Sequence, residues 1–372
     1  MKIKFSKTEI TSGDIKDVSK VLKSGWLTHG AYSYKFEDAL KKFTGSKYCT
    51  LVSSCTAGLH VSCIASGFKK GDEVIVPSVT HTATAHAVEF TGAKAIICDV
   101  DKDSGNLTLE TISKKITKKT KGIILVHMSG VSCELTPILS FCKNKNITIL
   151  EDCAHGLGTY YKSKHVGNYG ATGSFSFYPT KQVTTGEGGA VITNDKKIFK
   201  KIKALKAFGI DKDINERKKQ GHYDVKLLGL NYRLTDFQAS LGFNQIKRYK
   251  INLKKRKLIA KRYIKNLSNV KNLKITPYNK DNSYFIYQVF CKSRDKILKN
   301  FKKLNIGVSV HYSTPLHRMS YYRNKYKLNP KNYLNSENYS SKNISLPVYP
   351  KLNYKEIDYI CDTLKKMLNH EK

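Results

Sequence analysis

Seven short apolar runs divide the first half of the chain, and they constrain its fold more than any other feature. Segments of helical character lie between them, among them 57–66, 80–91 and 138–144. Apolar runs that alternate with helices are typical of an α/β domain whose mainly parallel sheet is buried on both faces. The runs are 48–53, 73–77, 94–99, 122–127, 147–152, 173–177 and 190–193. We therefore expect a seven-stranded sheet with ligand chemistry at the carboxyl ends of its strands.

After Leu234 the pattern changes to that of a second, smaller α+β domain. The predicted elements are helices at 235–249, 253–267 and 354–368, strand-like runs at 283–290 and 307–311, and an Asn/Lys/Tyr-rich surface loop at 321–339. The basic run 254–257 is expected to be solvated, as charged helix faces are. We place the large domain at residues 1–245 and the small domain at residues 246–372.

The chain is strongly basic, with 66 Lys and Arg against 29 Asp and Glu and a formal net charge of +37. A balance of this size suggests nucleic acid, an anionic membrane or a phosphorylated small molecule as a partner. Only eight of the basic residues are Arg, however, although recognition of bases and phosphates favours the guanidinium group. The lysines are spread over the whole chain, so a compositional bias explains most of the charge. We expect neither a nucleic-acid nor a membrane partner.

The nine cysteines include no Cys-x-x-Cys pair, which argues against a zinc site and against a secreted disulfide framework. The first residues have no apolar signal core, and no stretch approaches the roughly 20 apolar residues of a membrane span. We therefore expect a cytoplasmic protein without a bound metal.

The segment 174–190 contains the most informative lysine of the chain. A predicted strand leads into a loop with Lys181, and a glycine-rich return leads into the next strand. Hydroxyl groups in this segment, such as that of Ser176, can bind a phosphate, while its glycines let backbone approach a ligand closely. A lysine amine buried there has a lowered pKa and can form a Schiff base.

A carboxylate and a small-residue turn accompany this lysine. Asp152 ends a predicted strand 29 residues before Lys181, so it faces the same crevice. An acid beside a pyridine nitrogen keeps the ring protonated, as an electron-sink cofactor requires, although a strand-end Asp is equally often a turn former. The turn 53–58, Ser-Ser-Cys-Thr-Ala-Gly, offers hydroxyl and backbone N–H groups to a phosphate, but an ordinary helix start has the same pattern.

With these three stretches together, the sequence closely resembles the DegT/StrS family of pyridoxal-phosphate-dependent nucleotide-sugar aminotransferases, which have the aspartate aminotransferase fold. The resemblance extends almost from end to end. Its further motifs are Pro77-Ser-Val-Thr-His81-Thr-Ala-Thr-Ala, Leu228-Gly-Leu-Asn231-Tyr-Arg-Leu-Thr-Asp-Phe-Gln-Ala, Val310-His311-Tyr312, Pro315-Leu-His317, Tyr321-Tyr322 and Ser345-Leu-Pro347. It implies a three-layer large domain and a homodimer with shared active sites.

The resemblance also implies a role for each site residue. Lys181 is the internal-aldimine lysine, Asp152 the partner of the pyridine nitrogen, and His155 lies beside the ring's 3-hydroxyl group. The cofactor phosphate is held by Thr56, Ala57, Ser176 and the partner subunit's Asn231. His81 stands where the family usually has an aromatic residue stacked on the ring, which imidazole can also do. Candidate contacts to the sugar are Glu187, His311, Tyr312 and His317, each of which is as easily structural.

Two features of the lysine loop narrow the expected activity. Relatives that dehydrate sugars have His in place of Lys181, so the lysine favours amino transfer. The loop Thr184-Thr-Gly-Glu187-Gly-Gly resembles that of enzymes acting at sugar carbon 4, which suggests transfer from L-glutamate to a 4-keto-6-deoxy nucleotide sugar for surface polysaccharide or glycan synthesis. The alternatives are a carbon-3 aminotransferase and, from a different class, a non-catalytic regulatory or nucleic-acid-binding relative.

Overall fold

A seven-stranded sheet forms the centre of the protein in a computed structural model that describes residues 1–210, 219 and 221–369. Its order is β1-β9-β8-β5-β4-β2-β3, and β9 is the one strand of this sheet that runs antiparallel to its neighbours. The strands are β1 (Tyr48–Val52), β2 (Glu73–Pro77), β3 (Lys94–Cys98), β4 (Thr120–Val126), β5 (Thr148–Asp152), β8 (Thr172–Ser176) and β9 (Gly189–Thr193). All seven predicted strands are confirmed.

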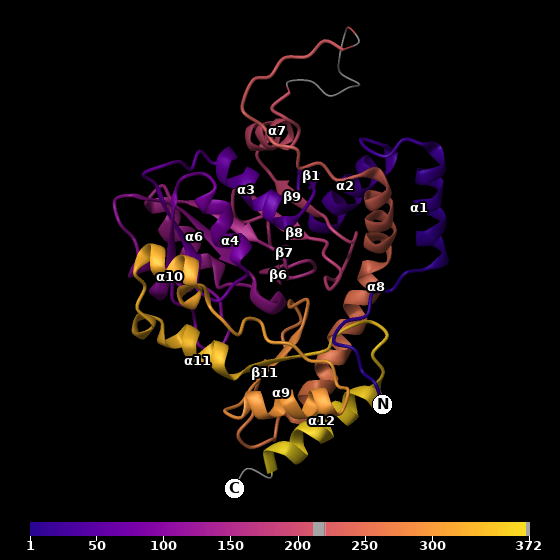
Figure 1. The fold of residues 1–372 in the computed structure, drawn as a ribbon, viewed down its shortest axis with the longest axis vertical. Helices are drawn as coiled ribbons and strands as arrows, with labels where there is room; N and C mark the ends of the chain where they lie inside the picture. The colour runs from indigo at the N-terminus through magenta and orange to yellow at the C-terminus, as the bar shows by residue number, and fades with distance from the viewer. Residues whose placement is uncertain (211–218, 220, 370–372) are drawn as a thin grey trace.

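Helices cover both faces of this sheet, which gives three layers (Figure 1). Alternate strand residues determine the faces: Val74 and Val76 pack with α3 and α4, whereas Ile75 packs on the opposite side with α5 and α6. The helices of this part are α1 (Ser12–Ser24), α2 (Ala31–Thr44), α3 (Cys55–Ala65), α4 (Thr82–Glu89), α5 (Leu109–Ser113), η1 (Met128–Gly130), α6 (Leu135–Asn144) and α7 (Lys196–Leu205), and a small hairpin pairs β6 (Tyr160–Tyr161) with β7 (Lys164–His165).

A three-stranded antiparallel sheet, β10-β11-β12, forms the core of the C-terminal part together with α9 and α12. Its elements are α8 (Asp236–Leu267), β10 (Lys274–Ile275), β11 (Tyr287–Phe290), α9 (Arg294–Lys303), η3 (Leu316–Arg318), α10 (Ser320–Tyr326), η4 (Pro330–Asn332), α11 (Leu334–Lys342), β12 (Asn343–Leu346) and α12 (Tyr354–Asn369). Ile3 also packs into this core, so the chain begins on the C-terminal part. The domain boundary at 245/246 stays a prediction, and it falls inside α8.

Three predictions for the C-terminal part are wrong. The segments 235–249 and 253–267 form the single helix α8, which runs from the large sheet to the smaller one (Figure 1). The run 307–311 contributes only an isolated pairing of Ser309 with Ser345. The segment 321–339 is largely helical. In the basic run 254–257, Lys254 and Lys255 are exposed as expected, whereas Arg256 is buried.

All nine cysteines are buried, and none of them forms a disulfide bond. Within the ranges that the structure describes, no helix has both the length and the apolar character needed to cross a bilayer.

Candidate active site

The carboxyl ends of the parallel strands bring the predicted site residues to one edge of the sheet. Asp152 is the last residue of β5, and Ser176 is the last residue of β8 beside it. Asp152 pairs in register with Ser174, and side chains two residues apart on a strand share a face, so Asp152 and Ser176 both face α3 and α4. The helices that follow β1 and β2 begin at this same edge, with Thr56 in the first turn of α3 and His81 as the N-cap of α4.

Lys181 lies in the turn after β8, and its amine contacts an aromatic ring. The Lys181 N–H donates to the Tyr178 carbonyl at 2.9 Å, which shapes the turn. The Nζ atom lies 4.4 Å from the centroid of the Phe285 ring, which comes from the C-terminal part of the chain. Burial lowers the pKa of Lys181 to about 8, against the opposing influence of Cys55 and Asp152. The amine is therefore easily deprotonated and can serve as a nucleophile or a base.

Asp152 is 4% exposed and accepts hydrogen bonds at both carboxylate oxygens. The Thr84 hydroxyl donates to Oδ2 at 2.8 Å, and the Ala154 N–H donates to Oδ1 at 3.0 Å. The Cys55 thiol lies 3.8 Å from Oδ1. These donors keep a buried carboxylate stable without a lysine or arginine bonded to it, so its charge is available to a cationic ring.

His155 is held in one tautomer. The Ser129 N–H donates to its Nδ1 atom at 3.3 Å, and its Nε2 atom lies 3.4 Å from the Tyr312 hydroxyl. Burial lowers the pKa of His155 well below its ordinary value, so the ring is neutral. A neutral ring that accepts at Nδ1 carries its proton on Nε2. His155 also stacks on Phe285 with centroids 4.3 Å apart, which fixes the direction of that proton.

The first turn of α3 offers hydroxyl and backbone N–H groups to an anion. Ser54 is the N-cap, and its hydroxyl accepts the Ala57 N–H at 3.0 Å. Gly189 permits the close approach of β9, because a Cβ atom there would lie 2.6 Å from the Ser54 carbonyl carbon. Ala57 is buried, while the side chains of Thr56 and Ser176 are partly exposed at this edge. Helix N-termini with adjacent hydroxyls are suited to phosphate.

Three further predicted residues lie near His155. The His311 ring is 6.0 Å from the His155 ring, and burial lowers the pKa of His311 to about 3. Tyr312 joins His155 to His81, whose ring centroid lies 6.2 Å from that of Tyr312. His81 accepts the Ala83 N–H at Nδ1, which holds its ring at the start of α4. The structure thus brings His81, His155, His311 and Tyr312 into one aromatic cluster.

Three other predicted residues lie outside this aromatic cluster. His317 is fully buried, and its two ring nitrogens bond to Ser78 at 2.6 Å and to Glu337 at 2.5 Å, so it is not directed at the site. Glu187 is exposed on the glycine-rich return. Asn231 is exposed and accepts a hydrogen bond from Arg233 at 3.1 Å.

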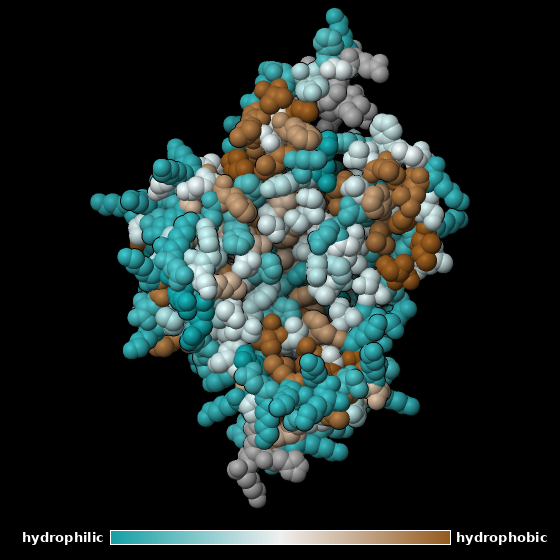
Figure 2. Space-filling view, in the orientation of Figure 1, coloured by the Kyte–Doolittle hydropathy of each residue, from teal (hydrophilic) through white to brown (hydrophobic). Residues whose placement is uncertain are grey.

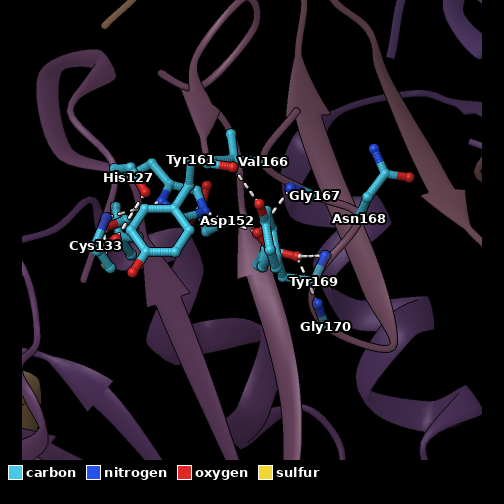
Figure 3. A network of polar contacts seen from close by, with 12 residues as sticks. His127, Cys133, Asp152, Tyr161, Val166, Gly167, Asn168, Tyr169 and Gly170 are labelled. Atoms are coloured by element: carbon cyan, nitrogen blue, oxygen red, sulfur yellow. Dashed lines mark hydrogen bonds and ion pairs between the residues drawn. The ribbon is translucent and has the colours of Figure 1, made fainter. Parts of the chain in front are cut away.

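Glu151 precedes Asp152 on β5, so its side chain lies on the opposite face of the strand. Figure 3 shows the network of polar contacts at this strand end, with His127, Gly167, Tyr169 and Gly170 labelled. Its carboxylate accepts the N–H groups of Gly167, Tyr169 and Gly170 at 2.6 to 2.7 Å, and it pairs with His127 at 3.0 Å. Burial alone raises the pKa of Glu151, but these hydrogen bonds lower it below its ordinary value. The two consecutive carboxylates therefore have separate surroundings, and only Asp152 faces Lys181.

Sequence reasoning missed Phe285, Thr84 and Ser129, each of which contacts a predicted residue. Phe285 and Ser129 lie far from Lys181 in the sequence and have no motif of their own. Thr84 could have been found from the sequence, because it lies in the first turn of the helix that follows the strand ending at Pro77. A hydroxyl group at such a position can reach the end of a neighbouring strand.

A mainly parallel sheet that places a buried lysine, a strand-end carboxylate and a helix N-terminus at one edge is the arrangement of pyridoxal-phosphate-dependent aminotransferases. The DegT/DnrJ/EryC1/StrS aminotransferase family matches residues 8–365. The chain belongs to this family, and pyridoxal phosphate is its cofactor.

Individual relatives agree over nearly the whole chain. Uncharacterized protein MJ1066 of Methanocaldococcus jannaschii is 38% identical over 371 residues, covering 96% of each chain. GDP-perosamine synthase of Escherichia coli O157:H7 is 33% identical over 364 residues, again covering 96% of each. Among solved structures, Helicobacter pylori PseC, an aminotransferase involved in the biosynthesis of pseudoaminic acid, superposes with a TM-score of 0.93 at 28% identity over 100% of both chains. The PLP form of Spr1654 from Streptococcus pneumoniae gives 0.92 at 28% identity, covering 100% of this chain and 99% of that one.

Proposed function

We propose that the protein transfers the amino group of L-glutamate to a 4-keto-6-deoxy nucleotide sugar, giving a 4-amino-4,6-dideoxy nucleotide sugar for surface polysaccharide or glycan synthesis. The observation that carries the proposal is the Lys181 amine, which is buried at the same sheet edge as Asp152. This burial lowers the pKa of the amine to about 8. The cofactor, when bound, supplies an electron sink that stabilises a carbanion.

The chain's own residues supply acid–base chemistry and orientation. Lys181 holds the cofactor and then, as a free amine, moves a proton to and from the donor's α-carbon. Asp152 presents its carboxylate to the ring nitrogen and favours the protonated ring, while the Thr84 hydroxyl and the Ala154 N–H hold the carboxylate in place. His155 directs its Nε2 proton at the ring's 3-hydroxyl group. Thr56, Ala57 and Ser176 hold the phosphate at the first turn of α3.

Two considerations support a sugar as the amino acceptor. The relatives named above include a synthase of GDP-perosamine and an aminotransferase of pseudoaminic acid biosynthesis. The lysine loop favours amino transfer over dehydration, and its 184–189 segment resembles that of carbon-4 enzymes. We propose that His81 stacks on the cofactor ring, and that His311, Tyr312 and the exposed Glu187 contact the sugar.

We propose further that the enzyme is a homodimer and that Asn231 reaches the phosphate of the partner subunit. Large apolar side chains lie exposed near the segment that contains Asn231, namely Trp26, Leu27, Phe208, Val225 and Leu228. Figure 2 shows hydrophobic patches beside α7 and over the α1 side of the molecule. Contiguous apolar surface of this kind marks an interface, and a second copy of the chain covers it.

Matched keto sugars test the position of amination. The purified enzyme is incubated with glutamate and a panel of 4-keto-6-deoxy and 3-keto-6-deoxy nucleotide sugars carrying UDP, GDP or dTDP. Mass spectrometry detects the amine, and NMR locates it on the ring. We expect an amine at carbon 4, and amination only at carbon 3 would contradict the proposal.

A further inference from the structure

Asp152 is the end of a chain of buried hydroxyl groups that starts on the loop before α4. Thr80 and Thr84 are 1% and 0% exposed, and their hydroxyl oxygens lie 2.8 Å apart. The Thr84 oxygen lies a further 2.8 Å from Oδ2 of Asp152. The chain is completely enclosed, so bulk water does not compete for these bonds.

The direction of the chain follows from the chemistry of its members. An ionised carboxylate only accepts hydrogen bonds, and a hydroxyl has a single proton to donate. Thr84 therefore donates to Asp152, and Thr80 must donate to Thr84. Both hydroxyl dipoles point toward Asp152, and Thr84 occupies the first turn of α4.

Asp152 has room for one further donor. A carboxylate offers about four lone-pair sites. The Thr84 hydroxyl and the Ala154 N–H use two of them. The Cys55 thiol has a single proton and lies nearer to the Ser174 carbonyl, at 3.5 Å, than to Oδ1 of Asp152, at 3.8 Å. A lone pair therefore remains for the single N–H that a protonated pyridine ring presents.

We propose that Thr84, oriented by Thr80, is a positioning residue that fixes the Asp152 carboxylate and aims its free lone pair at the ring nitrogen of the cofactor. Without the Thr84 proton, Oδ2 loses its donor, and the carboxylate can rotate away from the ring nitrogen or exchange Oδ2 for another partner. Either event weakens the partner of the ring nitrogen. The inference rests on the cofactor and not on the identity of the sugar.

A hydroxyl-specific pair of variants tests the proposal. Thr84→Val removes the donor and keeps the shape, whereas Thr84→Ser keeps the donor. Thr80→Val leaves Thr84 in place but removes its own donor. Thr82→Val is the matched control, because Thr82 lies on the same helical turn and its side chain has no hydrogen bond to the described part of the chain. Circular dichroism and thermal melting of the cofactor-free proteins check that each variant folds.

Two measurements report on the cofactor directly. Apoprotein is titrated with pyridoxal phosphate, and the nitrogen-15 shift of ring-labelled cofactor reports protonation of its ring nitrogen. We expect Thr84→Val to bind the cofactor about ten- to a hundredfold more weakly, the effect of losing a hydrogen bond to a charged group, and to move the shift toward the unprotonated ring. Thr80→Val should show a smaller change in the same direction, while Thr84→Ser and Thr82→Val stay near wild type.

The kinetic signature is a lower kcat with glutamate at an unchanged KM. A folded Thr84→Val protein with wild-type affinity and a wild-type nitrogen shift would overturn the proposal, as would a Thr84→Ser variant as impaired as Thr84→Val. Failure to aminate a keto sugar would count against the proposed function alone, because cofactor binding and the nitrogen shift need no sugar.

Discussion

Lys181 shows how burial alone can prepare a reactive group. Its Nζ atom faces the Phe285 ring at 4.4 Å, and Asp152, the nearby carboxylate, is already bonded to Thr84 and Ala154. The ammonium form therefore loses hydration without gaining a full ion pair, so the pKa of Lys181 falls to about 8. The turn that contains Lys181 is closed by a hydrogen bond from the Thr185 N–H to the carbonyl of Phe177, the residue after β8. This bond helps to keep the amine in place.

This environment predicts the pH dependence of cofactor attachment. Only the neutral amine attacks the cofactor, and a pKa of about 8 leaves roughly a tenth of it neutral at pH 7, far more than for an ordinary lysine. Stopped-flow mixing of apoprotein with pyridoxal phosphate should show a rate that rises with pH and levels off above about pH 8. Asp152→Asn should shift this midpoint downward, because the Asp152 charge raises the pKa. A midpoint near that of free lysine would contradict the account.

Lys181, Asp152 and His155 were predictable because each belongs to a local pattern of strand, turn and small residues. Their partners were not, since Phe285 and Ser129 reach them through tertiary packing. Arg256 shows that a local sequence pattern can also mislead. It stands in a basic run, yet its Nη1 atom donates to the carbonyls of Tyr284, Phe285 and Val348, contacts that no helical pattern reveals.

At the scale of elements, α8 corrects the prediction of two helices. The residues flanking the expected break, Tyr249 and Leu253, are both buried against the large sheet, and the Tyr249 hydroxyl donates to the Leu157 carbonyl at 2.7 Å. The weak helix propensity of Asn252 costs only a few tenths of a kcal/mol, so packing outweighs it.

The Asn/Lys/Tyr-rich composition of the segment 321–339 predicts a surface loop. In the structure Tyr322, Tyr333 and Tyr339 are almost completely buried. Each hydroxyl has a partner, respectively His86, the Ile97 carbonyl and Gln288. A tyrosine ring contributes apolar burial once its hydroxyl is paired, which composition alone does not show.

The segment just before Asn231 leads to a prediction about dimer formation. Leu228 is 93% exposed, and burial of such a side chain at an interface contributes about 1.5–3 kcal/mol. Leu228→Asp also places a charge there, so we expect the dimer dissociation constant to rise by about a hundredfold or more. Analytical ultracentrifugation measures it. Leu334→Asp, which changes a 70% exposed leucine at the start of α11, is the control. A monomeric wild-type protein at micromolar concentration would refute the proposed dimer.

At the scale of the whole molecule, the site joins the two parts of the chain. Lys181, Asp152 and His155 lie in the part of the chain that contains the large sheet. Phe285 and Tyr312 come from the C-terminal part: Phe285 contacts both Lys181 and His155, and Tyr312 contacts His155. The chemistry therefore depends on how the C-terminal part packs against the sheet. The seven strands followed directly from the apolar runs, but this packing did not, because it rests on residues far apart in sequence.

The net charge of the whole chain says less about its binding partners than its size suggests. Most of the +37 charge comes from lysines spread along the sequence. The lysine that defines the chemistry is buried, and burial lowers its pKa to about 8. A basic surface is compatible with anionic substrates such as nucleotide sugars, but it does not identify them.

Amino transfer from glutamate to the cofactor tests the central claim most directly. The purified protein, loaded with pyridoxal phosphate, is mixed with L-glutamate, and its absorption spectrum and the release of 2-oxoglutarate are followed together. We expect a yellow protein that loses its visible band as it forms about one equivalent of 2-oxoglutarate per site, and we expect Lys181→Ala to abolish this turnover. A colourless protein with full activity, or a Lys181→Ala variant that turns over glutamate at the wild-type rate, would contradict the account.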